Sequence, residues 1–448
     1  MDEAQSLMFE VPWLFKRMPD IVDDLKTESS VMQAATTREC LPYLSGQKNF
    51  ERNSYGVPKL RREGHVEFLQ SWLGDLEPDF VSLDAGRPWI VYWSISGLGM
   101  LGYDMKQFKD GVVANVEQCQ HPEGGIAGGF GHAAHLATTY ATLLSLVSVG
   151  DESALDCVNR KTMWQWLGKM KQLDGGFTMC HGGEEDARGA FCAVIILSLL
   201  NLPLELPSDS PARVKGDETF LTGLPEWISR CQTYEGGISA SPGTEAHGAY
   251  TFCALGALCV MGAPYEMINR YLDLDALVSW LTSRQYAPEG GLAGRANKLV
   301  DGCYSHWIGG CWALVEAAVR GPDSDGLLGQ PSLWHREGLT RYILCCAQAD
   351  KGGLRDKPSK HPDGYHSCYN LAGLSAAQNV YIFDRSLIGT DDPIQGNGLT
   401  APFKWTNQPF IDVPCEEGDR VSPYHPVFVV PLGKAEAARR YFASKGGF

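Results

Sequence analysis

Long apolar runs recur along the chain, and five of them follow a Gly-Gly pair. Upstream of most pairs lies an amphipathic segment with tryptophan or tyrosine, such as MWQWLGKMKQ or PEWISRCQ. Downstream lie a loop and a long apolar segment, such as HLATTYATLLSLV or RGAFCAVIILSLL. This order predicts a helical hairpin with one half-exposed helix and one buried helix. The glycine pairs are Gly124–Gly125, Gly175–Gly176, Gly236–Gly237, Gly290–Gly291 and Gly352–Gly353.

The pairs lie roughly 50–60 residues apart, which indicates an internal repeat. Residues 83–101, LDAGRPWIVYWSISGLGML, have the apolar run without a preceding pair and are interpreted as an atypical sixth unit. Six hairpins can close into a ring with the apolar helices inside, so the predicted fold is all-α, an α/α barrel or α6/α6 toroid. An open helical solenoid is the alternative, but its stacked units would be more uniform in length.

The repeat also divides the chain. Residues 1–70 are predicted to form an N-terminal arm and helix, and residues 71–385 the barrel. Residues 386–448 lose the periodicity and are rich in Pro, Gly and Asp, which predicts an irregular tail that packs on the barrel and ends in a short helix.

Polar residues occupy the start of each inner helix, ten to thirteen residues after the second glycine of a pair. Residues at the same position of each repeat lie at the same level along the axis of a closed ring, so these side chains should gather at one rim. One helical turn further, aromatic rings follow. A polar rim above an aromatic wall suits an amphiphile with an anionic head and an apolar tail; alternatively the rings fill a solid core. The rim residues are His135, Arg188, His247, Asp301 and His366, and the rings are Trp89, Trp93, Phe191, Tyr250, Trp307 and Tyr369.

Three rim residues have side chains that bind zinc. Asp301 and Cys303 are two residues apart, so they can face one ion only where a loop enters a helix. With His366 they offer carboxylate, thiolate and imidazole, and three protein ligands leave a fourth position open for catalysis. The alternative is that Cys303 is a buried, inert cysteine.

A second group consists of hydrogen-bond donors. Arg can grip phosphate oxygens in a bidentate manner and Lys adds a point charge, so four donors from adjacent units fit a diphosphate. The chain lacks a G-x-x-x-x-G-K-[ST] loop, which argues against nucleotide hydrolysis. The four residues are His247, Arg295, Lys298 and Tyr304.

Composition is that of a globular protein: 448 residues, 44% hydrophobic and 20% charged. The net charge of −15 gives no general footprint for nucleic acid. The longest apolar run, Ala193–Leu200, is too short to span a bilayer, and the N-terminus lacks secretory and myristoylation signals. The 14 cysteines are scattered without a framework spacing, so free thiols and a cytoplasmic location are expected.

Several segments together resemble the β subunits of the protein prenyltransferases, most closely the farnesyl-transferring type, from about His65 to Gln378. The family has an α/α barrel fold. The segments that carry the resemblance are LDAGRPWIVYW, DARGAFCA, EAHGAYTFCALGAL, GRANKLVDGCYSHW and LRDKPSKHPDGYHSCYNLAGLSAAQ.

The resemblance implies a role for each site residue. It implies zinc at Asp301, Cys303 and His366, and diphosphate at His247, Arg295, Lys298 and Tyr304. Asp356 matches a carboxylate that helps place magnesium. The surface for the substrate peptide is implied at Trp89, Trp93, His135, Ala137 and Tyr365. The isoprenoid wall is implied at Arg188, Tyr250, Cys253 and Trp307, with Trp89 and Tyr369 closing its far end.

The implied reaction is the transfer of farnesyl from farnesyl diphosphate to the cysteine of a C-terminal CaaX motif, in proteins such as small GTPases. The zinc-bound thiolate would attack C1 while the donors and magnesium stabilise the departing diphosphate. The resemblance also implies a helical α subunit that adds a lysine. The alternative within the family is geranylgeranyl transfer of type I or of the Rab type.

Four positions depart from the family pattern, and none is a proposed zinc or diphosphate ligand: Gly86, Thr138, Phe191 and Ala249. Three other classes of protein fit less well. A terpene cyclase would need a D-x-D-D or D-D-x-x-D motif, which LDLDAL and TDDPIQ do not match. A zinc hydrolase would need a general base such as that of H-E-x-x-H, which is absent from the sequence. A non-catalytic scaffold would have no reason to place the zinc-binding residues and the diphosphate donors at matching positions of the repeat.

Overall fold

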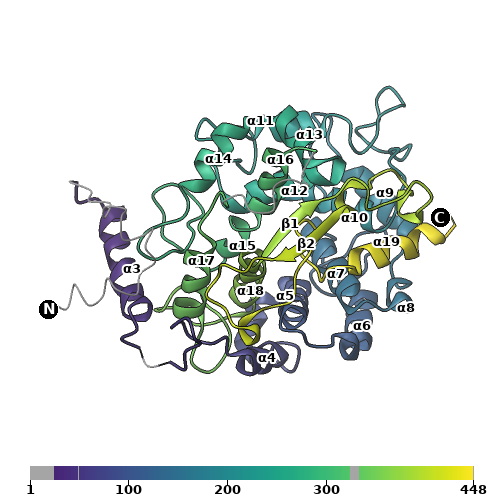
Figure 1. The fold of residues 1–448 in the computed structure, drawn as a ribbon. Coiled ribbons are helices and arrows are strands. Elements are labelled where there is room, and N and C mark those ends of the chain that lie inside the picture. The colour runs from purple at the N-terminus through teal and green to yellow at the C-terminus, as the bar shows by residue number, and fades with distance from the viewer. Residues whose placement is uncertain (1–24, 49, 323–331, 447–448) are drawn as a thin grey trace.

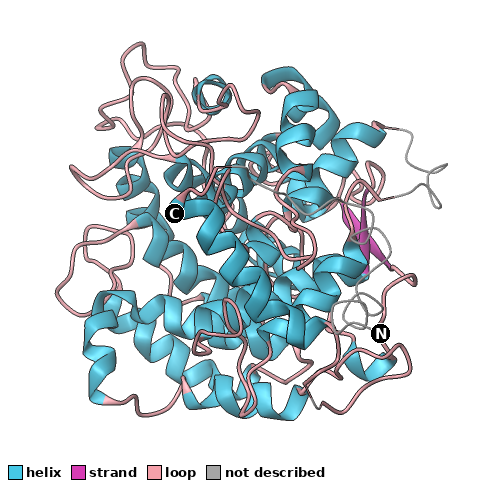
Figure 2. Cartoon of the chain, turned by 90° about the vertical axis from the view of Figure 1, so that its left-hand side faces the viewer, coloured by secondary structure: helices cyan, strands magenta, loops and turns pink. Residues whose placement is uncertain are grey.

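The computed structural model describes residues 25–48, 50–322 and 332–446, and there the chain forms two concentric layers of helices (Figures 1 and 2). The first 24 residues of the predicted N-terminal arm lie outside this part. The inner layer consists of α5 (Arg87–Met100), α7 (Leu136–Val149), α10 (Ala187–Leu199), α12 (Gly248–Met261), the interrupted pair α15 (Tyr304–Trp307) and α16 (Cys311–Arg320), and α18 (Gly364–Gln378). The outer layer consists of α4 (Arg62–Ser71), α6 (Lys109–Cys119), α9 (Arg160–Met170), α11 (Leu224–Arg230), α14 (Leu274–Thr282) and α17 (Arg336–Tyr342).

The inner layer is a closed ring. Each inner helix packs on the next along the chain, and the last, α18, returns to contact the first, α5. The inner helices can be enclosed because their sequences are apolar all round: in α10 every residue except Arg188 is buried. The predicted α/α barrel is therefore confirmed, and the open solenoid is excluded.

The glycine pairs let successive outer helices approach each other. Gly124 has φ 103°, and a Cβ atom there would collide with the backbone of Thr162 in α9. Gly352 has φ 96°, and its Cβ would collide with the backbone of Gly64 in α4. A side chain is thus excluded by both conformation and space. The contact at Gly64 joins the last hairpin to the first, so the outer layer closes as well.

Shorter elements decorate the barrel. Helix α3 stands beside the last outer unit, where it contacts η4. The elements are α3 (Glu28–Leu44), η1 (Pro78–Gly86), η2 (Lys106–Phe108), α8 (Glu152–Leu155), α13 (Pro264–Tyr271) and the π-helical turn η4 (Ile343–Ala347). Among the described residues, none of the helices combines the length and apolar character that crossing a membrane requires.

The C-terminal residues cover the end of the barrel at which the inner helices finish. The hydroxyl of Tyr424 donates to the carbonyl of Ser96 at 2.8 Å, and that of Tyr92 donates to the carbonyl of Val429 at 2.9 Å. A two-stranded antiparallel sheet, which the sequence did not predict, joins residues 379–383 to the tail. The elements are β1 (Asn379–Phe383), η5 (Pro393–Gln395), η6 (Ala401–Phe403), β2 (Trp405–Pro409), η7 (Glu417–Asp419) and α19 (Lys434–Ser444).

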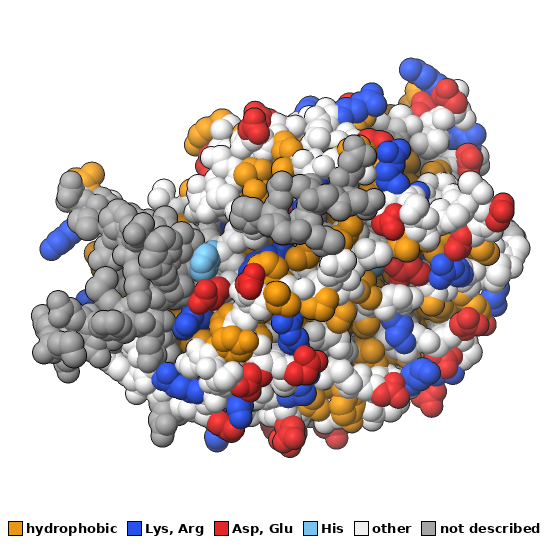
Figure 3. All heavy atoms as spheres, in the orientation of Figure 1, with side chains coloured by type: hydrophobic (Ala, Val, Ile, Leu, Met, Phe, Trp, Pro, Cys, Tyr) orange, Lys and Arg blue, Asp and Glu red, His pale blue; other side chains and the backbone are white. Residues whose placement is uncertain are grey.

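The tail thereby fixes where a site can form. With one end covered, the opposite end, where the inner helices begin, carries the rim residues. On the face drawn in Figure 3, which includes the tail, Lys and Arg side chains lie among Asp and Glu without forming a continuous basic patch.

Candidate functional site

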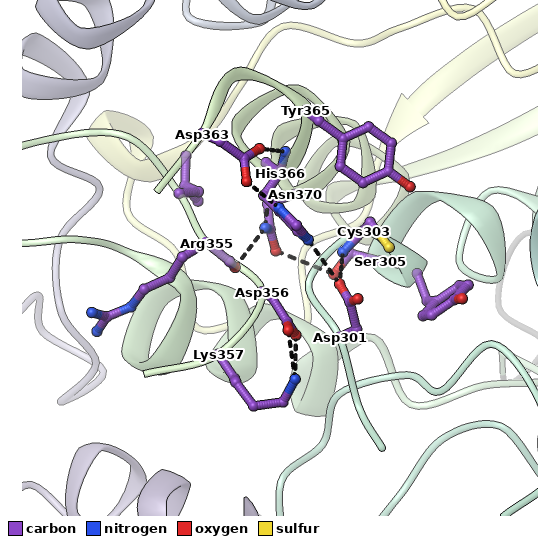
Figure 4. Close-up of polar contacts among 12 residues, drawn as sticks. Asp301, Cys303, Ser305, Arg355, Asp356, Lys357, Asp363, Tyr365, His366 and Asn370 are labelled. Atoms are coloured by element: carbon purple, nitrogen blue, oxygen red, sulfur yellow. Dashed lines mark hydrogen bonds and ion pairs between the residues drawn. The ribbon is translucent and has the colours of Figure 1, made fainter. Parts of the chain in front are cut away.

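Three side chains from two adjacent units converge at the rim (Figure 4). Potential ligand atoms of Asp301, Cys303 and His366 all lie within 4.8 Å of one another. Asp301 and Cys303 immediately precede α15, and His366 lies in the first turn of α18. The loop-to-helix junction required by the two-residue spacing is therefore present. Carboxylate, thiol and imidazole at this separation fit a zinc ion with a fourth position free.

Asp363 orients His366, and sequence reasoning missed it. Its carboxylate accepts from the His366 backbone N–H at 2.7 Å, which caps α18, and contacts Nδ1 of the same imidazole at 2.7 Å. Nε2 then points to Asp301, 3.2 Å away (Figure 4). A carboxylate on one ring nitrogen fixes the tautomer that presents the other nitrogen to a metal. Burial disfavours the imidazolium, but the two carboxylates outweigh it and raise the pKa of His366 to about 9.

The electrostatics of the triad favour a bound cation. Burial, followed by the nearby charge of Asp301, raises the pKa of Cys303 well above its usual value. The carboxylate of Asp301 also accepts from the Cys303 backbone N–H at 2.8 Å. A buried thiol beside a carboxylate becomes a thiolate only if positive charge is supplied. The donor set therefore fits a metal better than it fits three independent side chains.

We predict that Asp363→Asn lowers zinc affinity without removing a ligand. Asparagine can still cap α18, but it lacks the charge that supports His366, and loss of such a partner typically costs about 10–100-fold in metal affinity. Competition with a chromophoric chelator measures this. Asp273→Asn is the matched control, because Asp273 caps α14 in the outer layer by accepting from Ala276 at 2.9 Å. Equal zinc affinity in both variants would contradict the orienting role of Asp363.

The predicted diphosphate donors lie beside the triad. Nδ1 of His247 accepts from the Ala249 backbone N–H at 3.1 Å, so Nε2 of the neutral imidazole carries the proton. Nε2 lies 3.1 Å from the hydroxyl oxygen of Tyr304. Donation from Nε2 leaves the Tyr304 hydroxyl proton available to a ligand. Burial, and then the charge of Arg295, lowers the pKa of His247 and so favours this neutral form.

Two cations complete this donor group. Arg295 is partly exposed and pairs with Glu245 at 2.8 Å. Lys298 is exposed on the same loop. The loop is held against α12, because the Gly248 N–H donates to the carbonyl of Gly294 at 2.9 Å. His247, Tyr304 and Arg295 therefore lie close enough to influence one another, and Lys298 is exposed three residues further along the loop.

Asp356 lies next to the triad, on the loop before α18 (Figure 4). Its carbonyl accepts from the Gly302 N–H at 2.9 Å and from the Tyr342 hydroxyl at 2.6 Å. Asn370, which the sequence did not single out, ties the same loop to α18 by donating to the carbonyls of Arg355 at 3.1 Å and His366 at 2.9 Å. The loop and the metal ligands thus form one hydrogen-bonded unit.

The predicted aromatic wall is continuous below the triad. The ring centroids of Trp89 and Trp93 are 5.7 Å apart, and those of Trp93 and Tyr365 are 5.3 Å apart. Trp307 lies 4.5 Å from Tyr369 and donates from Nε1 to the Tyr365 hydroxyl at 3.0 Å. Tyr369 is buried, whereas the other four are only half-buried. Rings that keep partial exposure inside a closed barrel are the ones a ligand could reach, which is what the predicted aromatic wall requires.

The remaining lipid-wall residues come from α10 and α12. Arg188 packs over the Tyr250 ring, with its guanidinium 5.9 Å from the centroid, and Cys253 is buried. Asp186, also missed from the sequence, lies 2.5 Å from Arg188. Hydrogen bonding to Asp186 raises the pKa of Arg188. The guanidinium therefore stays charged, and its charge is balanced by that of Asp186. The aliphatic part of the side chain can cover apolar surface.

The predicted peptide residues of α7 lie at the same level. The Ala137 backbone N–H donates to Nδ1 of His135 at 3.2 Å, so His135 caps α7 as His247 caps α12. The side chains of His135 and His247 are both half-buried. One signal unites the residues that precede the inner helices: His135, Asp186, His247, Asp301 and Asp363 each lie ten residues after the second glycine of a pair. That position would have identified Asp186 and Asp363.

Comparisons with known proteins agree with this geometry. A family model described as the prenyltransferase α/α toroid domain matches residues 60–430. The protein farnesyltransferase subunit beta of Pyricularia oryzae is 48% identical over 98% of this chain and 85% of its own. That of Schizosaccharomyces pombe is 36% identical over 95% of this chain and 99% of its own.

A solved structure also matches. The Candida albicans protein geranylgeranyltransferase-I complexed with GGPP superposes with a TM-score of 0.62, over 86% of this chain and 99% of that chain. At 20% identity this likeness concerns the fold alone. The family match spans most of the chain, and both sequence relatives exceed the identity at which membership is secure. The chain therefore belongs to the prenyltransferase α/α toroid family, among the β subunits of protein farnesyltransferase.

Proposed function

We propose that this chain is the catalytic β subunit of a zinc-dependent protein farnesyltransferase. It would transfer farnesyl from farnesyl diphosphate to the cysteine of a C-terminal CaaX motif, together with an α subunit. The observation that supports the proposal is that Asp301, Cys303 and His366 lie within 4.8 Å of one another, beside the His247–Tyr304 pair and next to a row of partly buried aromatic rings.

Asp301, Cys303 and His366 would hold the zinc ion, with Asp363 fixing the imidazole. Bound at a position with one site open, zinc lowers the pKa of a coordinated thiol, so that a substrate cysteine is a thiolate at neutral pH. The role of the triad would be to set where the sulfur of the substrate cysteine lies relative to the diphosphate donors.

Transfer forms a bond between the sulfur and C1 of the isoprenoid and breaks the bond between C1 and the diphosphate oxygen. The leaving electron pair goes to the diphosphate, where His247, Arg295, Lys298 and Tyr304 would stabilise the growing charge. Magnesium at Asp356 would help to neutralise this negative charge, and by resemblance so would a lysine of the α subunit.

The aromatic wall would separate two ligands. Trp89, Trp93, His135, Ala137 and Tyr365 would receive the CaaX residues, for example those of small GTPases. The lipid would lie along the other side of the wall, formed by Arg188, Tyr250, Cys253, Trp307 and Tyr369, with Trp89 serving both sides and closing the far end of the lipid site. Tyr369, which is buried, would limit the length of the chain that fits.

A single-turnover assay tests the proposal. The chain, purified with its α subunit and loaded with zinc, is given a CaaX peptide and either farnesyl or geranylgeranyl diphosphate. We expect a clear preference for farnesyl. Preference for geranylgeranyl would support the type I alternative, and no thioether with either donor would contradict prenyl transfer.

We predict that Trp89→Thr, alone or with Tyr369→Phe, raises the use of the longer donor. Trp89 packs on Trp93 and lies 6.1 Å from the ring of Tyr140, so its removal opens space at the end of the wall. A fourth isoprene unit would then no longer clash. The measurement is kcat/KM for both donors, with the melting temperature.

Trp164→Thr is the matched control, because Trp164 is half-buried on the outer helix α9. It should leave the donor ratio unchanged. If Trp89 instead packed the core, its truncation would leave a cavity that costs about 3–5 kcal/mol, the usual loss for Trp to Ala. A destabilised Trp89→Thr protein with an unchanged donor ratio would remove the residue-level support for farnesyl.

A further inference from the structure

The loop before α18 carries an ion pair between neighbours in sequence. Nζ of Lys357 lies 2.6 Å from each carboxylate oxygen of Asp356 (Figure 4). The two side chains are only 9% and 14% exposed. A pair withdrawn from water to this degree is weakly screened, unlike the surface ion pairs of the molecule.

Hydrogen bonds from the segment that carries Asp301 and Cys303, and from α17, hold the backbone of the pair in place. The Asp356 carbonyl receives hydrogen bonds from Gly302, which lies between Asp301 and Cys303, and from Tyr342 of α17. The backbone therefore cannot turn the carboxylate away from the rim without breaking both. The symmetric contact of one ammonium with both oxygens occupies the place where a carboxylate would bind a divalent cation.

The surroundings of Asp356 call for a cation. Its carboxylate is largely withdrawn from water, and the Lys357 ammonium contacts both of its oxygens. Asp301 and Asp356 lie on two segments joined by the hydrogen bond from the Gly302 N–H to the Asp356 carbonyl, and each carboxylate has a basic partner: Asp301 has His366 and Asp356 has Lys357. Removal of Lys357 would leave a buried carboxylate beside a second one, an arrangement that attracts metal ions.

We propose that Lys357 is the resident cation of the Asp356 site and competes there with the divalent ion. Magnesium binds Asp356 only when the ammonium leaves, so Lys357 sets the affinity and supplies positive charge when no divalent ion is bound. This inference rests on the proposed function in one respect, the assignment of Asp356 to a metal that accompanies the diphosphate.

Binding of Mn²⁺, followed by electron paramagnetic resonance, tests the proposal independently of catalysis. The zinc-loaded heterodimer is titrated with Mn²⁺ in the presence of farnesyl diphosphate, so that the zinc site is occupied throughout. We expect Lys357→Met to lower the Mn²⁺ dissociation constant roughly tenfold, the factor that corresponds to the loss of one competing hydrogen bond between charged groups.

Three further variants make the test specific. Lys360→Met removes an exposed lysine of the same loop and should leave Mn²⁺ affinity unchanged. Lys357→Arg keeps a positive charge and should bind Mn²⁺ no tighter than wild type. Lys357→Met combined with Asp356→Asn should lose the gain, because the carboxylate itself is gone.

Unchanged or weaker Mn²⁺ binding by Lys357→Met, in protein with normal zinc content and melting temperature, would overturn the proposal. If that variant does not fold, Lys357→Gln is read by the same titration and the same criterion. A wild-type heterodimer that binds Mn²⁺ yet transfers no farnesyl would count against the proposed function alone, because the titration measures metal binding and not transfer.

Discussion

Replacement of Cys303 by alanine is expected to give a folded protein with well under one zinc ion per chain and no thioether formation. The change removes one of three converging ligands, so the remaining carboxylate and imidazole hold zinc far less tightly. The donor group and the aromatic wall are untouched, so farnesyl diphosphate should still bind. His366→Ala should behave in the same way. Elemental analysis and single-turnover transfer measure the two effects.

The control must lose a buried thiol without losing a ligand. Cys259 is fully buried in the last turn of α12, away from the rim, so Cys259→Ala should create a small cavity but keep zinc and transfer. Full zinc occupancy in the Cys303→Ala protein would be incompatible with the assigned metal site, whatever its activity.

The ring could be predicted because the repeat encodes it. An amphipathic outer helix, a glycine pair and an apolar inner helix recur with changing length but constant order, and only a closed arrangement encloses every apolar helix. The closure itself depends on residues far apart in sequence, such as Gly352 against Gly64. The glycine at 352 is visible in the sequence, whereas its partner in α4 is not marked by a pair.

The candidate metal triad could also be predicted, but not the contacts that Asp363 and Asp186 make with their neighbours. Asp301, Cys303 and His366 were identifiable by their chemistry at the start of inner helices. Asp363 and Asp186 share the same position in the repeat, yet an aspartate before a helix is more often only a cap. The shared position marks both as rim residues, but it does not reveal their contacts, which arise because His366 and Arg188 fold back onto them.

The tail and the ion pair at Asp356 lay beyond sequence reasoning for a related reason. Irregular segments carry no period, so the pairing of β1 with β2 and the contact of Tyr424 with Ser96 leave no pattern to detect. Lys357 follows Asp356 directly, and neighbours in an extended chain usually point apart. Only the fixed backbone of this loop turns both side chains toward each other.

The chemical step should slow by roughly two to three orders of magnitude in Arg295→Ala and in Lys298→Ala, because loss of one such donor typically costs about 2.7–4 kcal/mol in the transition state. In the free protein Arg295 pairs with Glu245. We expect it to exchange this partner for the diphosphate, which carries more negative charge. Peptide affinity should change far less, since the peptide residues lie elsewhere on the rim. Single-turnover rates and peptide dissociation constants separate the two effects.

Arg230→Ala provides a control of equal charge. Arg230 is 47% exposed and pairs with Asp174 at 3.5 Å in the outer layer, which resembles the state of Arg295, at 37% exposure and 2.8 Å from Glu245. A general field effect of lost positive charge would slow all three variants equally and would weaken with added salt. If the donor group specifically stabilises the leaving group, Arg230→Ala should keep the wild-type rate while Arg295→Ala and Lys298→Ala are slow. Wild-type single-turnover rates in both Arg295→Ala and Lys298→Ala would mean that the diphosphate lies outside this donor group.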